Sequence, residues 1–175
     1  YRSPPWISLE LHPLVAEAQT LVQPLAQQRD IAVSAAPLQG LVVRADRQRL
    51  KQVLLNLLSN AVKFTQRGEV LVTVDSQRVD DASERIHFAV RDTGIGIAPE
   101  ARERIFREFE QADDRIARSY GGTGLGLSIS DRIVKRMGGR ITLESQPDAG
   151  STFEVSIPLV AAEGEWSRGE LPAGI

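Results

Sequence analysis

The sequence predicts an α/β domain, because stretches with the apolar spacing of helices alternate with stretches whose apolar residues recur at every second position. Clusters of glycine and proline separate these stretches and mark the turns between them. The predicted helices cover residues 9–29, 46–65 and about 127–137, and the predicted strands cover residues 31–35, 41–44, 69–76, 84–91, 140–146 and 152–158.

The chain opens with residues 1–8, a proline-rich stretch that we interpret as an extended lead-in from an upstream region. Residues 9–29 follow as a helix whose apolar side chains share one face. Two short strands, 31–35 and 41–44, are then joined by a turn that contains Pro37 and Gly40.

The helix over residues 46–65 is the most informative element, and Asp46 is placed to cap its first turn. Asn56, Asn60 and Lys63 recur at helical spacing along the edge of its apolar stripe. Asn competes for backbone hydrogen bonds inside a helix, so two of them one turn apart need a reason. Either they form a solvated polar edge, or they form a magnesium and phosphate site, since a hard cation prefers oxygen ligands and lysine neutralises phosphate charge.

Strand 84–91 follows strand 69–76 in the chain and leads directly into the loop Asp92-Thr-Gly-Ile-Gly. Gly94 and Gly96 allow backbone torsions or close approaches that a side chain would forbid. The carboxylate of Asp92 could accept a hydrogen bond from the exocyclic amine of a purine. Taken alone, this short pattern also fits an ordinary turn.

A polar and charged stretch, residues 110–120, has few apolar anchors and predicts a mobile lid. Before it, Pro99 is placed to open a short helix, and Phe106 and Phe109 supply two aromatic anchors. After it, residues 121–126 contain four glycines directly before a helix. Backbone amides and the positive end of a helix dipole suit a phosphate at such a point. The run matches neither a Walker loop nor a dinucleotide fingerprint.

The end of the chain reads as a glycine stop at residues 138–139, a hairpin of two strands around residues 147–150, and a tail. The tail, residues 161–175, has the composition of a linker or a disordered segment. We therefore expect the domain itself to span residues 9–160.

Composition excludes several classes of function. The net charge of −2 and the lack of a basic block argue against a nucleic-acid partner. No apolar run has the length of a membrane span, so we expect no direct membrane contact. The start lacks the apolar core of a signal peptide, and there is no cysteine, which fits a cytoplasmic setting. Because the first residue is Tyr1, we expect a piece of a longer protein.

Four motifs stand in one order: the Asn56, Asn60 and Lys63 helix, the Asp92 loop, the Phe106 and Phe109 pair, and the glycine run. The ordered set resembles the catalytic ATP-binding domain of sensor histidine kinases, within the GHKL group of ATP-binding folds. The resemblance implies a two-layer α/β sandwich, with a mixed sheet of about five strands covered by about three helices and a flexible ATP lid.

The resemblance also implies ATP and Mg²⁺ as cofactors and a role for each motif residue. Asn60 would bind the metal, supported by Asn56. Catalysis would involve Asn56, Lys63 and Arg118. Asp92 would accept a hydrogen bond from the adenine amine, with room for the base at Gly94 and Gly96. Phe64 would line the pocket, Phe106 and Phe109 would anchor the lid, and phosphates would meet the amides of Gly122, Gly124, Leu125 and Gly126. Thr152 and Phe153 match a late motif that is more structural than chemical.

The implied partner is a dimerisation hairpin that carries the phosphoacceptor histidine, because His12 and His87 lie in other contexts and are interpreted as surface residues. A response regulator receiver domain would act downstream. We expect the fragment to be monomeric and unable to phosphorylate itself efficiently. The competing functions are a GHKL-type ATPase, which would need a Glu base where Asn56 stands, an anti-sigma-type serine kinase, and a nucleotide-binding scaffold without transfer activity.

Overall fold

A computed structural model of the chain describes residues 6–36, 42–78, 84–106 and 126–159. In chain order the elements are β1 (Trp6–Glu10), α1 (Leu11–Gln28), β2 (Ala32–Ala35), β3 (Val42–Asp46), α2 (Arg47–Lys63), β4 (Glu69–Arg78), β5 (Glu84–Asp92), the 3-10 turns η1 (Pro99–Ala101) and η2 (Arg104–Phe106), α4 (Gly126–Arg136), β6 (Arg140–Gln146) and β7 (Gly150–Leu159).

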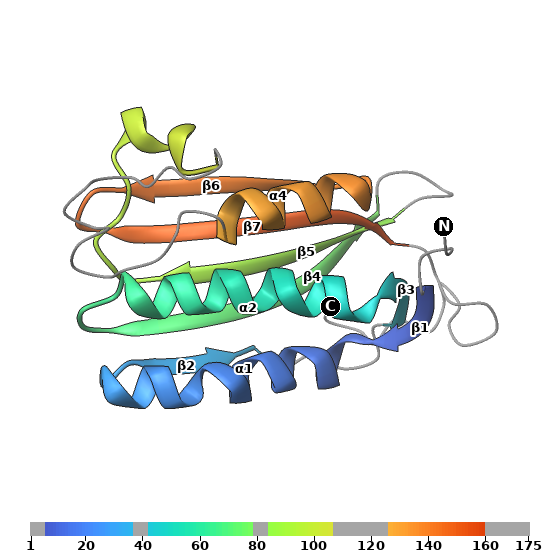
Figure 1. Cartoon of the computed structure of the whole chain (residues 1–175), viewed down its shortest axis with the longest axis horizontal. Helices are drawn as coiled ribbons and strands as arrows, with labels where there is room; N and C mark the ends of the chain where they lie inside the picture. The colour runs from blue at the N-terminus through green and yellow to red at the C-terminus, as the bar shows by residue number, and fades with distance from the viewer. Residues whose placement is uncertain (1–5, 37–41, 79–83, 107–125, 160–175) are drawn as a thin grey trace.

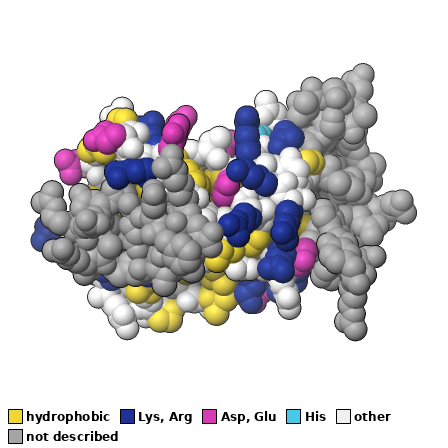
Figure 2. Space-filling model, turned by 45° about the horizontal axis from the view of Figure 1, so that its top comes forward, with side chains coloured by type: hydrophobic (Ala, Val, Ile, Leu, Met, Phe, Trp, Pro, Cys, Tyr) yellow, Lys and Arg dark blue, Asp and Glu magenta, His cyan; other side chains and the backbone are white. Residues whose placement is uncertain are grey.

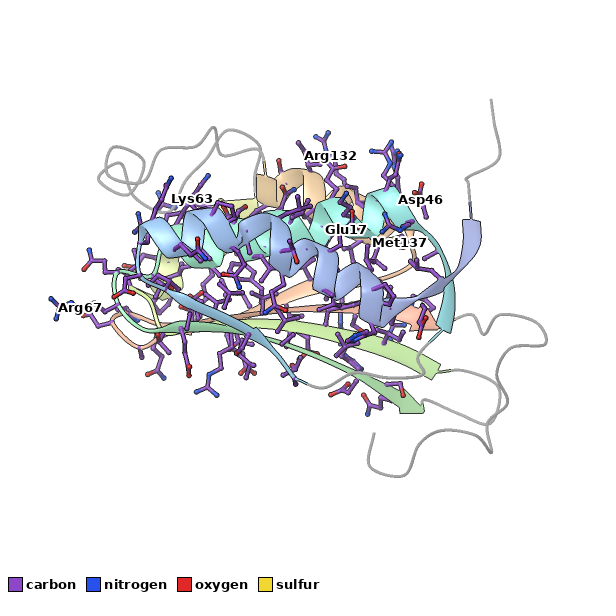
Figure 3. All side chains as sticks on the ribbon, turned by 90° about the horizontal axis from the view of Figure 1, so that it is seen from below. Glu17, Asp46, Lys63, Arg67, Arg132 and Met137 are labelled. Carbon is purple, nitrogen blue, oxygen red and sulfur yellow. The ribbon has the colours of Figure 1, made fainter. Side chains whose placement is uncertain are left out.

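The main sheet has five strands in the order β2-β4-β5-β7-β6, and a separate two-stranded sheet pairs β1 with β3. β2 runs parallel to β4, whereas β4, β5, β7 and β6 form antiparallel pairs. The helices lie together on one side of the main sheet (Figure 1; Figure 3). The predicted two-layer sandwich with a mixed sheet is therefore confirmed.

Long-range pairing separates two strands that lie next to each other in the sequence. The predicted strands at 31–35 and 41–44 both form, but β2 joins β4 in the main sheet and β3 pairs with β1. β1 takes up part of the stretch that the sequence assigns to an extended lead-in. The alternation of apolar residues predicts that a segment is a strand, but it does not specify which strand becomes its neighbour.

The core lies between the inner face of the sheet and the apolar faces of α1 and α2. α2 buries the stripe that its sequence predicts, and β5 contributes Ile86, Phe88 and Val90 from alternate positions. At the start of α2, the carboxylate of Asp46 accepts a hydrogen bond from the backbone N–H of Arg49 at 3.2 Å, which confirms the predicted cap.

The outer face of the sheet carries polar side chains. His87, interpreted from the sequence as a solvated strand residue, is only 19% exposed, and its Nδ1 lies 3.0 Å from Oε1 of Glu154. The predicted face is therefore confirmed, but the side chain is half-buried and not fully solvated, because a neighbouring strand supplies a cross-strand partner. None of the helices in the described ranges combines the length and the apolarity that crossing a membrane requires.

Candidate functional site

The polar edge of α2 faces the first turn of α4. Asn56 donates from Nδ2 to the carbonyl oxygen of Gly126 at 3.2 Å and to the hydroxyl of Ser130 at 3.1 Å. This places both hydrogens of the carboxamide on α4 and leaves its Oδ1 for another partner. Asn56 is thus not part of a merely solvated edge, because it joins α2 to α4. Its two partners in α4 lie 70 and 74 positions further along the chain.

Asn60 lies one turn further along α2, beside the same end of α4. A Cβ built on Gly126 would lie 4.0 Å from Nδ2 of Asn60 and 3.9 Å from Cγ of Asn56. The two asparagines and this glycine are therefore neighbours, as the motif order predicts. Within the described part of the chain, the side chain of Asn60 makes no hydrogen bond, so its carboxamide is available to a ligand.

Lys63 and Phe64 form the end of α2, at the opposite end from Asp46 (Figure 3). Phe64 caps the helix, with its backbone N–H donating to the carbonyl oxygen of Asn60 at 3.0 Å. Arg29 reaches this turn from the end of α1 and donates from Nη2 to the carbonyl oxygen of Lys63 at 3.0 Å. Arg29 was not a candidate in the sequence, where a single arginine after a helix carries no signal of such a contact.

Asp92 ends β5 with its side chain on the buried face of the sheet, and it is only 6% exposed. Its Oδ1 accepts the backbone N–H of Gly94 at 2.9 Å and that of Ser151 at 3.2 Å. Burial raises the pKa of Asp92 above its ordinary value, and these two hydrogen bonds oppose the rise. Because both of these bonds use Oδ1, the second carboxylate oxygen remains as an acceptor for a ligand.

The glycines after Asp92 are required by the backbone itself. A Cβ on Gly94 would lie 2.3 Å from the carbonyl oxygen of Phe64, and a Cβ on Gly96 would lie 1.9 Å from that of Gln146. Gly96 also has φ +72°, which favours glycine. The close approaches and torsions that the sequence predicts for both glycines are therefore confirmed, whereas their making room for a base stays a prediction. Their missing side chains let the loop pack against α2 and against the β6–β7 hairpin.

Ser145 and Ser151 support the Asp92 loop from that hairpin and were not recognised in the sequence. The two hydroxyls lie 2.8 Å apart, and the hydroxyl of Ser145 also accepts the backbone N–H of Ile97 at 2.7 Å. Both serines are buried. The sequence shows only that both serines stand in predicted strands or at their ends, which is a weak signal of a buried hydrogen bond.

Other predicted site residues have a different status. Phe106 packs edge-on against Phe153, with ring centroids 6.2 Å apart, so it is anchored to the core. Phe153 lies in β7 and is buried, as expected of a structural position. Outside the described residues lie Phe109, the predicted lid at 110–120, Arg118, Gly122, Gly124 and Leu125.

The donor chemistry of the α2 edge fits a magnesium ion that is held mainly by other oxygens. Magnesium is usually bound by one or two protein oxygens together with waters and substrate phosphates, so a single carboxamide oxygen is a suitable contribution. The described residues contain no group of three or more His, Cys, Asp or Glu that could hold a metal by themselves. A metal would therefore enter this site together with a phosphate-bearing ligand.

Charge and shape are uneven over the surface of the domain. Lys and Arg side chains, with a few acidic ones among them, are grouped near the middle of the face shown in Figure 2. A separate depression of about 610 Å³ adjoins Asp92 and is lined by Arg91, Arg102, Glu144 and the β6–β7 hairpin. None of the residues that line it belongs to α2, so it is distinct from the asparagine edge.

Comparisons with known proteins agree with this geometry. Residues 45–161 match the model of the family described as histidine kinase-, DNA gyrase B-, and HSP90-like ATPase. Sensor histidine kinase AruS of Pseudomonas aeruginosa is 45% identical over 163 residues, covering 91% of this chain and 16% of AruS. Signal transduction histidine-protein kinase BarA of Escherichia coli is 44% identical over 117 residues, covering 67% of this chain and 13% of BarA.

Solved structures give the same result. Full-length ShkA in complex with AMPPNP superposes with a TM-score of 0.79 at 34% identity, covering 94% of this chain and 33% of ShkA. The nucleotide-free catalytic domain of histidine kinase ThkA gives a TM-score of 0.74 at 30% identity, covering 88% of this chain and 95% of that domain. The chain therefore belongs to the histidine kinase-, DNA gyrase B- and HSP90-like ATPase family, and within it to the catalytic ATP-binding domains of sensor histidine kinases.

Proposed function

We propose that this domain binds Mg²⁺-ATP and supplies the γ-phosphoryl group to a histidine on a dimerisation hairpin elsewhere in the parent protein. The observation that carries the proposal is that Asn56 and Asn60 of α2 lie beside Gly126, the first residue of α4. Lys63 ends the same helix α2 that carries the two asparagines. Phosphoryl transfer depends mainly on positioning and charge neutralisation, and this edge offers amide oxygens and a cation for both.

Each residue has a distinct part in the proposed site. Asn60 contributes an oxygen to the metal, Asn56 fixes the distance between α2 and α4, and Lys63 meets phosphate oxygens. Asp92 accepts the exocyclic amine of adenine through the oxygen that the backbone leaves open. Phe64 borders the pocket, and Gly122, Gly124, Leu125, Gly126 and Arg118 would serve the phosphates, as the resemblance implies.

In the reaction itself, a nitrogen of the acceptor imidazole forms a bond to the γ-phosphorus while the bond from that phosphorus to the β-γ bridging oxygen breaks. ADP leaves with the electron pair, and the imidazole loses its proton. Bound Mg²⁺ would neutralise charge on the phosphates. Asn60 and Lys63 orient those phosphates, and Asp92 orients the base.

A hydrolytic ATPase is the second candidate, and one contact argues against it. A water nucleophile needs a base, and relatives of that kind place a Glu at the position of Asn56. Here Asn56 acts as a double donor to the carbonyl oxygen of Gly126 and the hydroxyl of Ser130. A carboxylate could not donate to the carbonyl, so this interface is built for an amide.

The wider setting is part of the same proposal. The chain spans 16% of AruS. We propose that the parent protein carries the hairpin, acts on a downstream receiver domain and places this domain in the cytoplasm. We propose that the domain occupies residues 9–160 together with the start of β1 (Trp6–Glu10), and that a linker or tail follows over 161–175. The fragment should be monomeric and should not phosphorylate itself, because neither His12 nor His87 lies beside the α2 edge.

The test is calorimetric titration of the chain with non-hydrolysable analogues of ATP and GTP, with and without Mg²⁺. We expect magnesium-enhanced binding that prefers the adenine analogue. Asn60→Ala should abolish the magnesium enhancement, whereas Gln48→Ala, at an exposed position of the same helix, should bind as the wild type does. Equal affinity for Asn60→Ala and the wild type would contradict the metal assignment, and absence of any nucleotide binding would contradict the function.

A further inference from the structure

We infer that Ser145 is a positioning residue for base selectivity, acting on Asp92 through the β6–β7 hairpin. The inference rests on the proposed adenine-reading role of Asp92 and extends it to a residue that acts through Asp92. Ser145 lies near the end of β6, and Asp92 closes β5, two strands away in the sheet. The connection between them runs through hydrogen bonds that involve Ile97, Gly150 and Ser151.

The hydroxyl of Ser145 joins the two segments that border Asp92. It accepts the backbone N–H of Ile97 at 2.7 Å, which lies in the loop that follows Asp92. It also lies 3.0 Å from the carbonyl oxygen of Gly150 and 2.8 Å from the hydroxyl of Ser151, on the hairpin side. Ser145 is only 8% exposed, so water cannot readily replace these partners.

Ser151 carries the connection onward to the carboxylate. Its backbone N–H donates to Oδ1 of Asp92 at 3.2 Å, and the N–H of Gly94 donates to the same oxygen at 2.9 Å. One of these donors belongs to the hairpin and the other to the loop. The rotation of the carboxylate therefore depends on how the hairpin and the loop are held relative to each other, which is what Ser145 fixes.

The backbone around these contacts leaves little freedom. Asp148 donates its backbone N–H to the carbonyl oxygen of Ile95 at 2.6 Å. Gly150 lies so close to β5 that a Cβ there would be 2.1 Å from the carbonyl oxygen of Asp92. Arg102, between η1 and η2, donates to the carbonyl oxygen of Ser145. The hairpin and the loop thus form one unit, in which the side chain of Ser145, like that of Asp92, bonds to both halves.

Base selectivity follows from the orientation of the remaining oxygen. Adenine presents an amine donor where guanine presents a carbonyl acceptor, so a carboxylate oxygen held in one direction accepts from the first and repels the second. A site built to pair with one polar group rejects the analogue that lacks it. If the carboxylate can turn, part of that discrimination is lost even though Asp92 itself is unchanged.

The experiment compares the ratio of GTP-analogue to ATP-analogue dissociation constants, measured by calorimetry at one Mg²⁺ concentration. Ser145→Ala should lower this ratio by about tenfold, the loss expected for one buried hydrogen bond. Ser145→Thr, which keeps the hydroxyl, should recover most of it. Ser156→Ala is the matched control, because Ser156 is also buried and bonds through its hydroxyl to Nε of Arg85 at 2.9 Å, away from Asp92.

The outcomes separate this inference from the proposed function. An adenine-selective wild type whose ratio is unchanged in Ser145→Ala would overturn the inference and leave the proposed function standing. A drop of equal size in Ser156→Ala would also overturn it, since loss of stability alone would then explain the effect. If Ser145→Ala does not fold, Ser151→Ala tests the same hydroxyl pair while keeping the backbone N–H, and an unchanged ratio there overturns the inference. A wild type with no adenine preference overturns both proposals.

Discussion

The carboxamide of Asn56 and the hydroxyl of Ser130 lie 3.1 Å apart and join the middle of α2 to α4. Ser130 is completely buried, so its hydroxyl has no access to water. The same carboxamide bonds to Gly126, which borders Asn60. The spacing between the metal-site residue and the start of α4 is therefore set by a contact within the protein, before any ligand arrives.

Ser130→Ala should lower the free energy of unfolding by about 1 kcal/mol, since it removes one net hydrogen bond to a buried group. Nucleotide affinity should fall as well, although Ser130 would not touch the ligand. A double-mutant cycle with Asn56→Ala, measured by denaturant unfolding, should give a coupling energy above about 0.5 kcal/mol. Additive effects of the two substitutions would contradict the proposed joint between the helices.

Asp92→Asn should change stability and binding in opposite directions. Burial raises the pKa of Asp92, so the folded state disfavours the charged carboxylate. The substituted side chain keeps a carbonyl oxygen for the N–H groups of Gly94 and Ser151, so the variant should be at least as stable as the wild type at neutral pH. Its affinity for an ATP analogue should nevertheless fall by about tenfold, because an amide replaces the accepting carboxylate.

The pH dependence of this difference has a definite sign. A raised pKa in the folded state gives the wild type stability that is fully present below the ordinary pKa of 3.8 and is lost as pH rises through the folded value. The carboxamide in the Asp92→Asn variant does not titrate. The advantage of the variant should therefore grow as the pH rises above 3.8 and then level off, as measured by urea unfolding at a series of pH values. A difference that stays constant across that range would contradict the raised pKa.

Gly94→Ala and Gly126→Ala should differ sharply, although both glycines belong to predicted motifs. A Cβ on Gly94 would lie 2.3 Å from the carbonyl oxygen of Phe64, so backbone must move, at a cost of about 1–3 kcal/mol. Among the described residues, a Cβ on Gly126 meets nothing closer than 3.9 Å, and alanine favours a helix over glycine by up to about 1 kcal/mol. Thermal unfolding should show a large loss for the first variant and none for the second; equal losses would contradict this steric account.

Sequence patterns predicted the features that depend on neighbours along the chain. The cap at Asp46 follows from its residue type at the start of a helix, and the buried stripe of α2 and the alternation in β5 follow from local periodicity; all three are present. The order of the motifs predicted the family. The separation of β2 from β3 was not predictable from these patterns, since strand pairing depends on contacts across the whole sheet.

The supporting contacts of the site were missed for a related reason. Ser145 and Arg29 act through a hydroxyl and a guanidinium that meet backbone atoms far away in the chain, and such contacts leave no periodic signal. The glycines of the Asp92 loop were recognised, but the groups that fill their space, the carbonyl oxygens of Phe64 and Gln146, belong to other elements. Side-chain type predicted the chemistry, whereas the partners required the fold.

Arg29→Met should loosen the end of α2 and weaken nucleotide binding together. The guanidinium donates to the carbonyl oxygens of Lys63 at 3.0 Å and Thr65 at 3.5 Å, where its positive charge also suits the negative end of the helix dipole. Losing these contacts should cost about 1–2 kcal/mol of unfolding free energy. Because Lys63 and Phe64 lie in the turn that Arg29 holds, the affinity for an ATP analogue should fall by several-fold more than global unfolding explains.

Arg67→Met is the matched control for that variant. Arg67 is exposed in the turn after α2, and its side chain points away from the domain (Figure 3). The substitution removes the same charge close to the same helix end without breaking a contact to Lys63. Calorimetry should therefore show near wild-type binding for Arg67→Met and weaker binding for Arg29→Met. Equal losses would mean that general positive charge near the site, and not the hydrogen bonds of Arg29, supports the nucleotide.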